Sequence, residues 1–262
     1  MVNTEPFFQG CPEYSGRLFL CMRKCLLLAT MLALVVGVSC SRGDTAAAEQ
    51  GVSLLSEDGV SLGVTLYTPR GSAGKPVGLV LVHRYGADRS VWEGFARLAR
   101  DSGMLVAAVD LRGHGESVVR NGRAVHYSQL SDEEIGESLK DIDAAKKYLL
   151  EAGADPENLV VAGEGLGANL CLRYALGSRD IQAVVMLSPG LEYNGIAAED
   201  AIKQLDDCPT LLLSGEGDAY AAMSAAALKT AAPVFSELRT WPGAAHGTDL
   251  FASHPESMQY VL

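Results

Sequence analysis

The stretch Asn158-Leu159-Val160-Val161-Ala162-Gly163-Glu164-Gly165-Leu166-Gly167 decides the fold of this chain. Its first half is a largely apolar run, which is typical of a strand that is buried on both faces of a parallel sheet. Its second half has glycine at every other position, and the mostly apolar segment 166–176 that begins there is long enough for a helix. The stretch therefore predicts a buried strand, a sharp glycine-rich turn and a helix.

The sequence on either side of this stretch repeats the alternation of apolar strands and amphipathic helices. The first two strands, at 52–56 and 60–67, flank Asp58-Gly59, a dipeptide that favours a tight hairpin turn. Further strands are expected at 77–83, 104–110, 181–187, 210–214 and 234–240, and further helices at 90–101, 132–151, 197–205 and 219–230. The pattern predicts an α/β fold with a mainly parallel central sheet, an N-terminal antiparallel hairpin and helices on both faces.

Polar residues and glycines gather immediately after the predicted strands. Ligands bind to such sheets beyond the carboxyl ends of the strands, so these segments are the candidates for a functional site. They are His83-Arg84-Tyr85-Gly86, Asp110 to Ser117, Gly163 to Gly167, Ser188-Pro189-Gly190, Gly217-Asp218 and Gly243 to Gly247. In this order they resemble the α/β-hydrolase family, and the resemblance covers about residues 51–262.

The resemblance implies three catalytic positions in a fixed chain order. In that family a Gly-x-Ser-x-Gly turn carries the nucleophile, and an acid and a histidine follow later strands. The corresponding positions here are Gly165, Asp218 and His246. The resemblance gives Asp218 the role of orienting the imidazole and His246 the role of moving the proton. We expect these two side chains to lie within hydrogen-bond reach, with His246 facing the Cα of Gly165.

The nucleophile position departs from the family pattern, because Gly165 has no side chain with which to attack a substrate. Loss of the nucleophile in a serine protease costs on the order of 10⁶ in turnover, although binding and oxyanion donors still give roughly 10³–10⁴ over water. Glycine also adopts the strained elbow conformation without a Cβ penalty. The sequence therefore predicts a stable α/β-hydrolase that is inactive or only weakly active.

The resemblance also indicates how an oxyanion and a ligand would be held. The backbone N–H of Leu166 and one N–H from Arg84 or Tyr85 would form the oxyanion hole. Only 21 residues separate Ser188 from Thr210, which is too few for a cap domain, so we expect an open, shallow pocket for a small acyl or ester-like ligand. The aromatic residues Tyr193 and Tyr220 are candidates to line it.

Several other residues have simpler structural interpretations. Four residues are expected to be structural or at the surface: His83 orients its loop, His114 belongs to a structural turn, and His126 and His254 are exposed. Ser188, before Pro-Gly, reads as a turn residue rather than a substitute nucleophile. Cys171 reads as a packed apolar residue, with a disulfide to Cys208 as the alternative. No cluster of residues has the spacing of a metal site, so we expect no metal and no cofactor.

The first 40 residues have the features of an export signal. Met22-Arg23-Lys24 is a short basic region, and 25–38 is an uncharged run that is too short to span a bilayer comfortably. Small residues before Cys40 resemble the site at which bacterial lipoproteins are lipidated, with Met22 as a candidate true start. We therefore expect an extension and signal at 1–40, a polar tether at 41–50 and the hydrolase domain at 51–262. This predicts a cell-envelope lipoprotein that is anchored in the membrane, with plain secretion or a periplasmic location as the alternative.

Charge and composition narrow the choice of function. The net charge of −11 without basic clusters argues against nucleic-acid binding, which depends on cations that meet phosphates. Three functions stay open: an inactive homologue that binds an ester-like ligand, a working hydrolase of small esters or amides, and a non-enzymatic envelope binding module. The working hydrolase would use water that His246 and Asp218 activate, or a substitute nucleophile.

Overall fold

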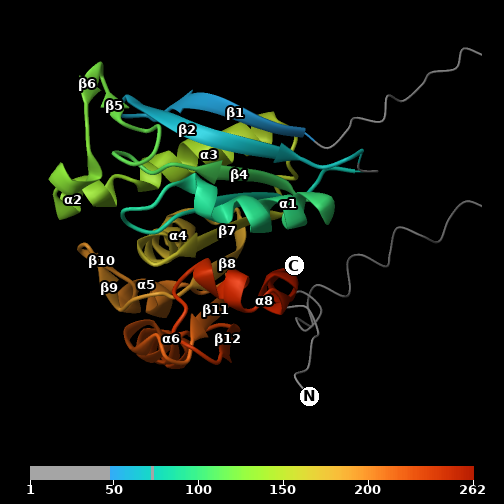
Figure 1. Ribbon diagram of the computed structural model, residues 1–262, viewed down its shortest axis with the longest axis vertical. Helices are drawn as coiled ribbons and strands as arrows, with labels where there is room; N and C mark the ends of the chain where they lie inside the picture. The colour runs from blue at the N-terminus through green and yellow to red at the C-terminus, as the bar shows by residue number, and fades with distance from the viewer. Residues whose placement is uncertain (1–47, 72–73) are drawn as a thin grey trace, which may run out of the picture.

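The computed structural model describes residues 48–71 and 74–262 of the chain (Figure 1). Within these residues ten strands form one sheet, and a two-stranded ribbon lies apart from it. The sheet contains β1 (Ala48–Leu55), β2 (Val60–Thr68), β3 (Gly78–Val82), β4 (Leu105–Val109), β5 (Val119–Arg120), β6 (Arg123–Ala124), β7 (Leu159–Glu164), β8 (Ile181–Leu187), β11 (Thr210–Gly215) and β12 (Ser236–Trp241). The ribbon consists of β9 (Glu192–Tyr193) and β10 (Ile196–Ala197).

The sheet is mainly parallel, as the apolar runs predict. Its strand order is β12-β11-β8-β7-β3-β4-β2-β5-β6, and β1 pairs with β2. The strands from β12 to β4 run parallel to one another, whereas β2 is antiparallel to β4 and to β1. All residues of β3, β4, β7 and β11 are buried, which explains why these strands lack the polar alternation of a half-exposed sheet.

Helices cover both faces of the sheet (Figure 1). They are η2 (Arg89–Trp92), α1 (Glu93–Asp101), η3 (Tyr127–Gln129), α2 (Asp132–Gly136), α3 (Leu139–Glu151), α4 (Leu166–Gly177), α5 (Glu199–Gln204), α6 (Ala219–Ala231), α7 (Asp249–Ser253) and α8 (Glu256–Val261). Ile142, Leu172 and Leu228 place α3, α4 and α6 in the core on one face. Phe95, Phe251 and Val261 place α1, α7 and α8 in the core on the other face. The predicted α/β class, with a mainly parallel central sheet and helices on both faces, is thus confirmed.

Several boundaries differ from the predicted ones for local reasons. The strand β1 begins at Ala48, inside the segment that we predicted as a tether. The predicted helix 132–151 is two helices, because α2 ends at Gly136 and α3 starts at Leu139; glycine is a poor helix former. The predicted helix at 197–205 is shorter, since β9 and β10 occupy the segment before it. The disulfide alternative is wrong, because Cys171 and Cys208 are both free and buried.

The topology sets the place of the functional site. The parallel strands β3, β7, β8, β11 and β12 end at one edge of the sheet, and the segments that follow them meet there. Cys40 and the other predicted features of the export signal lie outside the described residues.

Candidate active site

Gly165 forms a sharp elbow between β7 and α4. Its φ of 53° and ψ of −120° lie in a region of backbone conformation that residues other than glycine rarely adopt. Its N–H donates to Leu187 O at 2.9 Å, and its carbonyl accepts from Ala168 N–H at 3.1 Å. Glycine at this position therefore gives the elbow its shape without backbone strain.

The two outer glycines of the motif let three backbone segments approach closely. A Cβ on Gly163 would lie under 3.0 Å from the backbone of Gly167, and a Cβ on Gly167 would lie under 3.0 Å from Val82 O and His83 O. Such contacts are not compatible with any side chain, since backbone atoms have no rotamer with which to retreat. The glycine spacing is thus a packing requirement of the elbow.

Asp218 and His246 form the predicted pair opposite the elbow. Asp218 follows β11 and His246 follows β12, and Oδ2 of Asp218 accepts from Nδ1 of His246 at 2.7 Å. The opposite ring nitrogen, Nε2, would lie 3.3 Å from a Cβ built on Gly165. The expected geometry is therefore present: the carboxylate fixes the imidazole, and its free nitrogen faces the elbow.

Hydrogen bonds from the backbone of the two residues after His246 hold its loop in place. Gly247 N–H donates to Oγ of Ser188 at 2.9 Å, and Thr248 N–H donates to the Glu164 carboxylate at 2.6 Å. Ser188 is buried and has a φ of 46°, which is rare for serine. Ser188 is thus more than the predicted turn residue, because its hydroxyl holds the histidine loop.

Glu164 is a residue of the site that sequence reasoning did not single out. Its carboxylate is fully buried, and each of the two carboxylate oxygens accepts a hydrogen bond from Nη1 of Arg84 at 3.0 Å. It also accepts from the backbone N–H of Arg84 at 3.3 Å. The residue before the elbow therefore joins the loop after β3 to the loop after β12.

These contacts show which of the predicted oxyanion donors already has a hydrogen-bond partner. Leu166 is the first residue of α4, and the first N–H groups of a helix have no partner within the helix. The Arg84 N–H already donates to Glu164, so Tyr85 is the remaining candidate donor within that loop. The Tyr85 ring packs edge-on against Tyr127 with ring centroids 5.0 Å apart.

Two buried histidines, His83 and His114, form hydrogen bonds with the loops around the elbow. His83 contacts Arg84 O through Nδ1 at 2.7 Å and accepts from Leu111 N–H through Nε2 at 2.9 Å. Burial lowers the pKa of His83 to about 3, so the ring stays neutral. His114 accepts from Gly86 N–H through Nε2 at 3.1 Å. These contacts match the loop-orienting and structural interpretations of both residues.

Two tyrosines, Tyr193 and Tyr220, form an aromatic cluster with His246. Tyr193 packs edge-on against His246 and against Tyr220, with ring centroids 6.5 and 5.6 Å apart. Tyr220 exchanges hydrogen bonds with the backbone of Glu192, so the β9–β10 ribbon is fastened to α6. Between Ser188 and Thr210 the chain forms only this ribbon and α5, without a cap domain.

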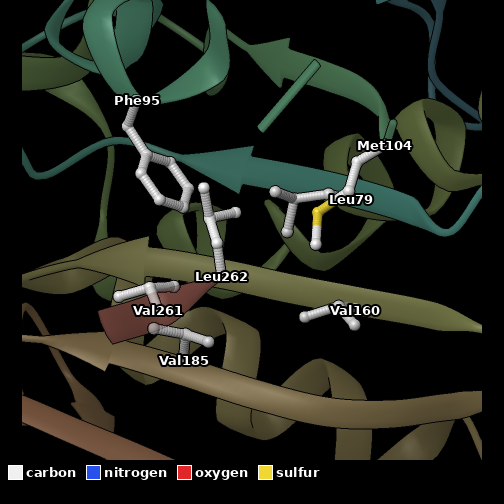
Figure 2. A pocket seen from close by; sticks show the side chains of 7 residues that line it. All are labelled: Leu79, Phe95, Met104, Val160, Val185, Val261 and Leu262. Carbon is white, nitrogen blue, oxygen red and sulfur yellow. The ribbon is translucent and has the colours of Figure 1, made fainter. Parts of the chain in front are cut away.

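An apolar hollow lies elsewhere in the molecule (Figure 2). Seven side chains line it: Leu79, Phe95, Met104, Val160, Val185, Val261 and Leu262. Its volume of about 10 Å³ is at the lower limit for one water molecule, and all seven lining side chains are apolar. Leu79 and Val160 lie near the amino ends of their strands, so the hollow is distant from the elbow.

Within residues 48–71 and 74–262 no group of three or more histidine, cysteine or acidic residues is arranged to hold a metal ion. No helix in the same residues is long and apolar enough to cross a membrane.

A glycine-bounded elbow, an acid and a histidine at the carboxyl ends of a parallel sheet define an α/β-hydrolase. More particularly, the chain belongs to the family described as serine aminopeptidase, S33, whose model matches residues 75–206. That match includes the elbow and ends before Asp218 and His246.

Two solved structures illustrate the likeness of the fold. An esterase of Pyrococcus furiosus is 18% identical, with a TM-score of 0.60, and the match covers 81% of this chain and 87% of that one. A dienelactone hydrolase of Anabaena variabilis is also 18% identical, with a TM-score of 0.61 and coverage of 81% and 96%. A comparison with curated proteins found no match.

Proposed function

We propose that this α/β-hydrolase binds a small acyl or ester-like ligand and hydrolyses esters weakly or not at all. The observation that carries the proposal is Gly165 at the elbow, opposite Nε2 of His246. Without an Oγ at this position no acyl-enzyme forms there, because no atom is available to bond to the acyl carbon. The backbone donors of Leu166 and Tyr85 do not depend on side chains, so they remain available to a ligand carbonyl.

A second candidate is a slow hydrolase that uses water directly. It is supported by the 2.7 Å contact between Asp218 and His246, which leaves Nε2 free to accept a proton. In this reaction the water oxygen bonds to the ester carbonyl carbon while its proton passes to Nε2. The tetrahedral oxyanion then collapses, the C–O bond of the alcohol breaks, and the alcohol leaves with the proton from Nε2. The products are a carboxylic acid and an alcohol.

A paired ester-hydrolysis assay tests the proposal. The unaltered protein, Gly165→Ser and Gly165→Ala are compared on p-nitrophenyl acetate and with a fluorophosphonate label. Alanine adds the same Cβ without an oxygen, so it is the matched control for the nucleophile. We expect labelling only in Gly165→Ser. Ordinary serine-esterase turnover by the unaltered protein would refute the proposal.

His246→Ala separates the two candidates. If the unaltered protein has a weak activity that His246→Ala removes, the water-based hydrolase is supported. If a weak activity is the same in both proteins, the pair does not contribute to it, and the binding role stands.

We also propose that the chain is exported and anchored through a lipid on Cys40. The support is the order of the basic region 22–24, the uncharged run 25–38 and the small residues before Cys40. Expression in a bacterium with labelled palmitate should label the chain, and Cys40→Ala should abolish the label. Retention of the label in Cys40→Ala, or a soluble unlabelled chain, would contradict the anchor.

A further inference from the structure

We propose that Arg84 is a positioning residue that crowds the nucleophile position, so that a serine at 165 reacts at its full rate only when the Cβ of residue 84 is also removed. The inference rests on the proposed function, in which position 165 is where the nucleophile would stand. It adds a second obstacle to serine catalysis, and this obstacle is not evident from the Gly-x-Ser-x-Gly pattern.

The contact that carries the inference is between two Cβ positions. A Cβ built on Gly165 would lie 3.1 Å from the Cβ of Arg84 and 3.9 Å from its Cα. Ordinary van der Waals contact between carbons requires about 3.5–4.0 Å. Because the obstructing atom is attached directly to the backbone, rotation of the Arg84 side chain does not move it. The contact of the same Cβ with His246 Nε2, at 3.3 Å, is with a ring that can turn.

Several hydrogen bonds also fix Arg84, so its backbone does not move away from residue 165 easily. Its guanidinium bonds to both oxygens of the buried Glu164 carboxylate, and its backbone N–H donates to Oε1 of the same residue. Its carbonyl contacts Nδ1 of the buried His83 at 2.7 Å. The backbone at 84 is therefore fixed from the elbow and from β3 at once.

The same arrangement affects the oxyanion donors. Since Glu164 uses the backbone N–H of Arg84, this group is not free for a substrate carbonyl. A serine at 165 would have to shift away from Arg84, and its Oγ would move relative to His246 Nε2 and to the N–H groups of Leu166 and Tyr85. A displacement of 1 Å in such a site costs roughly 10²-fold in rate.

The test compares three variants that all carry Gly165→Ser. They are Gly165→Ser alone, with Arg84→Ala, and with Arg84→Gly. Alanine removes the guanidinium but keeps the Cβ, whereas glycine removes both, so the pair isolates the Cβ contact. The readout is the second-order rate constant of fluorophosphonate labelling, with Gly165→Ala as the blank.

We expect labelling of the Arg84→Gly form to be 10- to 100-fold faster than labelling of Gly165→Ser alone, and the Arg84→Ala form to gain less than about threefold. Equal rates in all three forms would overturn the inference, as would a gain in Arg84→Ala equal to that in Arg84→Gly. Absence of labelling in every folded form would overturn it as well.

Loss of Arg84 leaves the Glu164 carboxylate without its cation, so each form is also made with Glu164→Gln, and thermal unfolding verifies the fold. If the forms with Glu164 do not fold, the ratio in the Glu164→Gln series decides. Failure of the proposed function can be told apart from failure of this inference, because ester turnover by the unaltered protein would refute that function without changing the ratio between the serine variants.

Discussion

Thr248 donates its backbone N–H to the buried carboxylate of Glu164 at 2.6 Å, across 84 positions of sequence. The residue before the elbow thereby holds the loop of His246, two residues before Thr248. Arg84 supplies the cation that balances the charge of this carboxylate. The histidine is thus positioned by groups that do not include residue 165, which explains how the pair with Asp218 persists without a nucleophile.

Glu164→Ala should destabilise the protein strongly. It removes the partner of the Arg84 guanidinium and the acceptor of Thr248 N–H, and the loss of one partner of a buried pair typically costs about 3–5 kcal/mol. Because 30% of the Arg84 side chain is exposed, water can replace part of the loss, so we expect a value near the lower end. Urea unfolding measures the change. The control is Glu116→Ala. The ion pair of Glu116 with Arg89 is partly exposed, so its loss should lower the free energy of unfolding by about 1 kcal/mol or less.

Ser188→Ala should loosen the histidine loop. It leaves the Gly247 N–H without its acceptor, which costs about 1–3 kcal/mol for a buried group. Ser188→Gly loses the same bond but relieves the strain of the positive φ, so it should be less destabilising by roughly 1 kcal/mol. The two free energies of unfolding provide the comparison. If the alanine form were the more stable of the two, strain at Ser188 would not be the explanation.

Gly163→Ala and Gly167→Ala should each prevent the formation of the native elbow. The added Cβ would meet backbone atoms that cannot rotate away, a case in which overpacking exceeds its usual cost of about 1–3 kcal/mol. Gly177→Ala, at the last residue of α4, is the matched control, since nothing lies within 4 Å of its added Cβ. Soluble yield and circular dichroism should separate the first two variants from the third. A native spectrum for Gly163→Ala would contradict this account of the glycine spacing.

The sequence allowed the sheet, the elbow and the Asp218–His246 pair to be predicted, because each depends on a local signal. Apolar runs identify buried strands, and the order of segments after those strands identifies the family. The contacts of Glu164 and Ser188 have no such signal: they join single polar residues to loops 84 and 59 positions away. The two-residue strands β5 and β6 are likewise too short to produce a periodic pattern.

The stability of the protein should fall with pH below neutrality in part through His83. Burial lowers its pKa from 6.5 to about 3, so only the unfolded chain binds a proton between these values. The contribution is full above about pH 6.5 and is lost as the pH falls toward 3. Between pH 7 and 5 this amounts to about 2 kcal/mol, a window in which most carboxylates stay ionised.

His83→Gln should therefore show a shallower dependence of unfolding free energy on pH in this window, although it is less stable at pH 7. Burial lowers the pKa of His114 as well, so a residual slope is expected. His126→Gln, at an exposed position, is the control and should retain the slope of the unaltered protein. Parallel curves for His83→Gln and the unaltered protein would show that His83 is not the origin of the effect.

Asp218→Asn should abolish most of the activity that a serine at 165 creates. The Asp218 carboxylate accepts from Nδ1 of His246 and so keeps Nε2 as the proton acceptor that faces the elbow. An asparagine can donate to Nδ1 instead, which favours the opposite tautomer and leaves Nε2 protonated; in a serine protease the same change costs about 10⁴ in turnover. In the Gly165→Ser, Arg84→Gly background we expect a loss of roughly 10³–10⁴ in ester hydrolysis. Because Asp218→Asn changes little volume, an unchanged melting temperature would assign the loss to the tautomer, whereas retained hydrolysis would show that the pair does not act on residue 165.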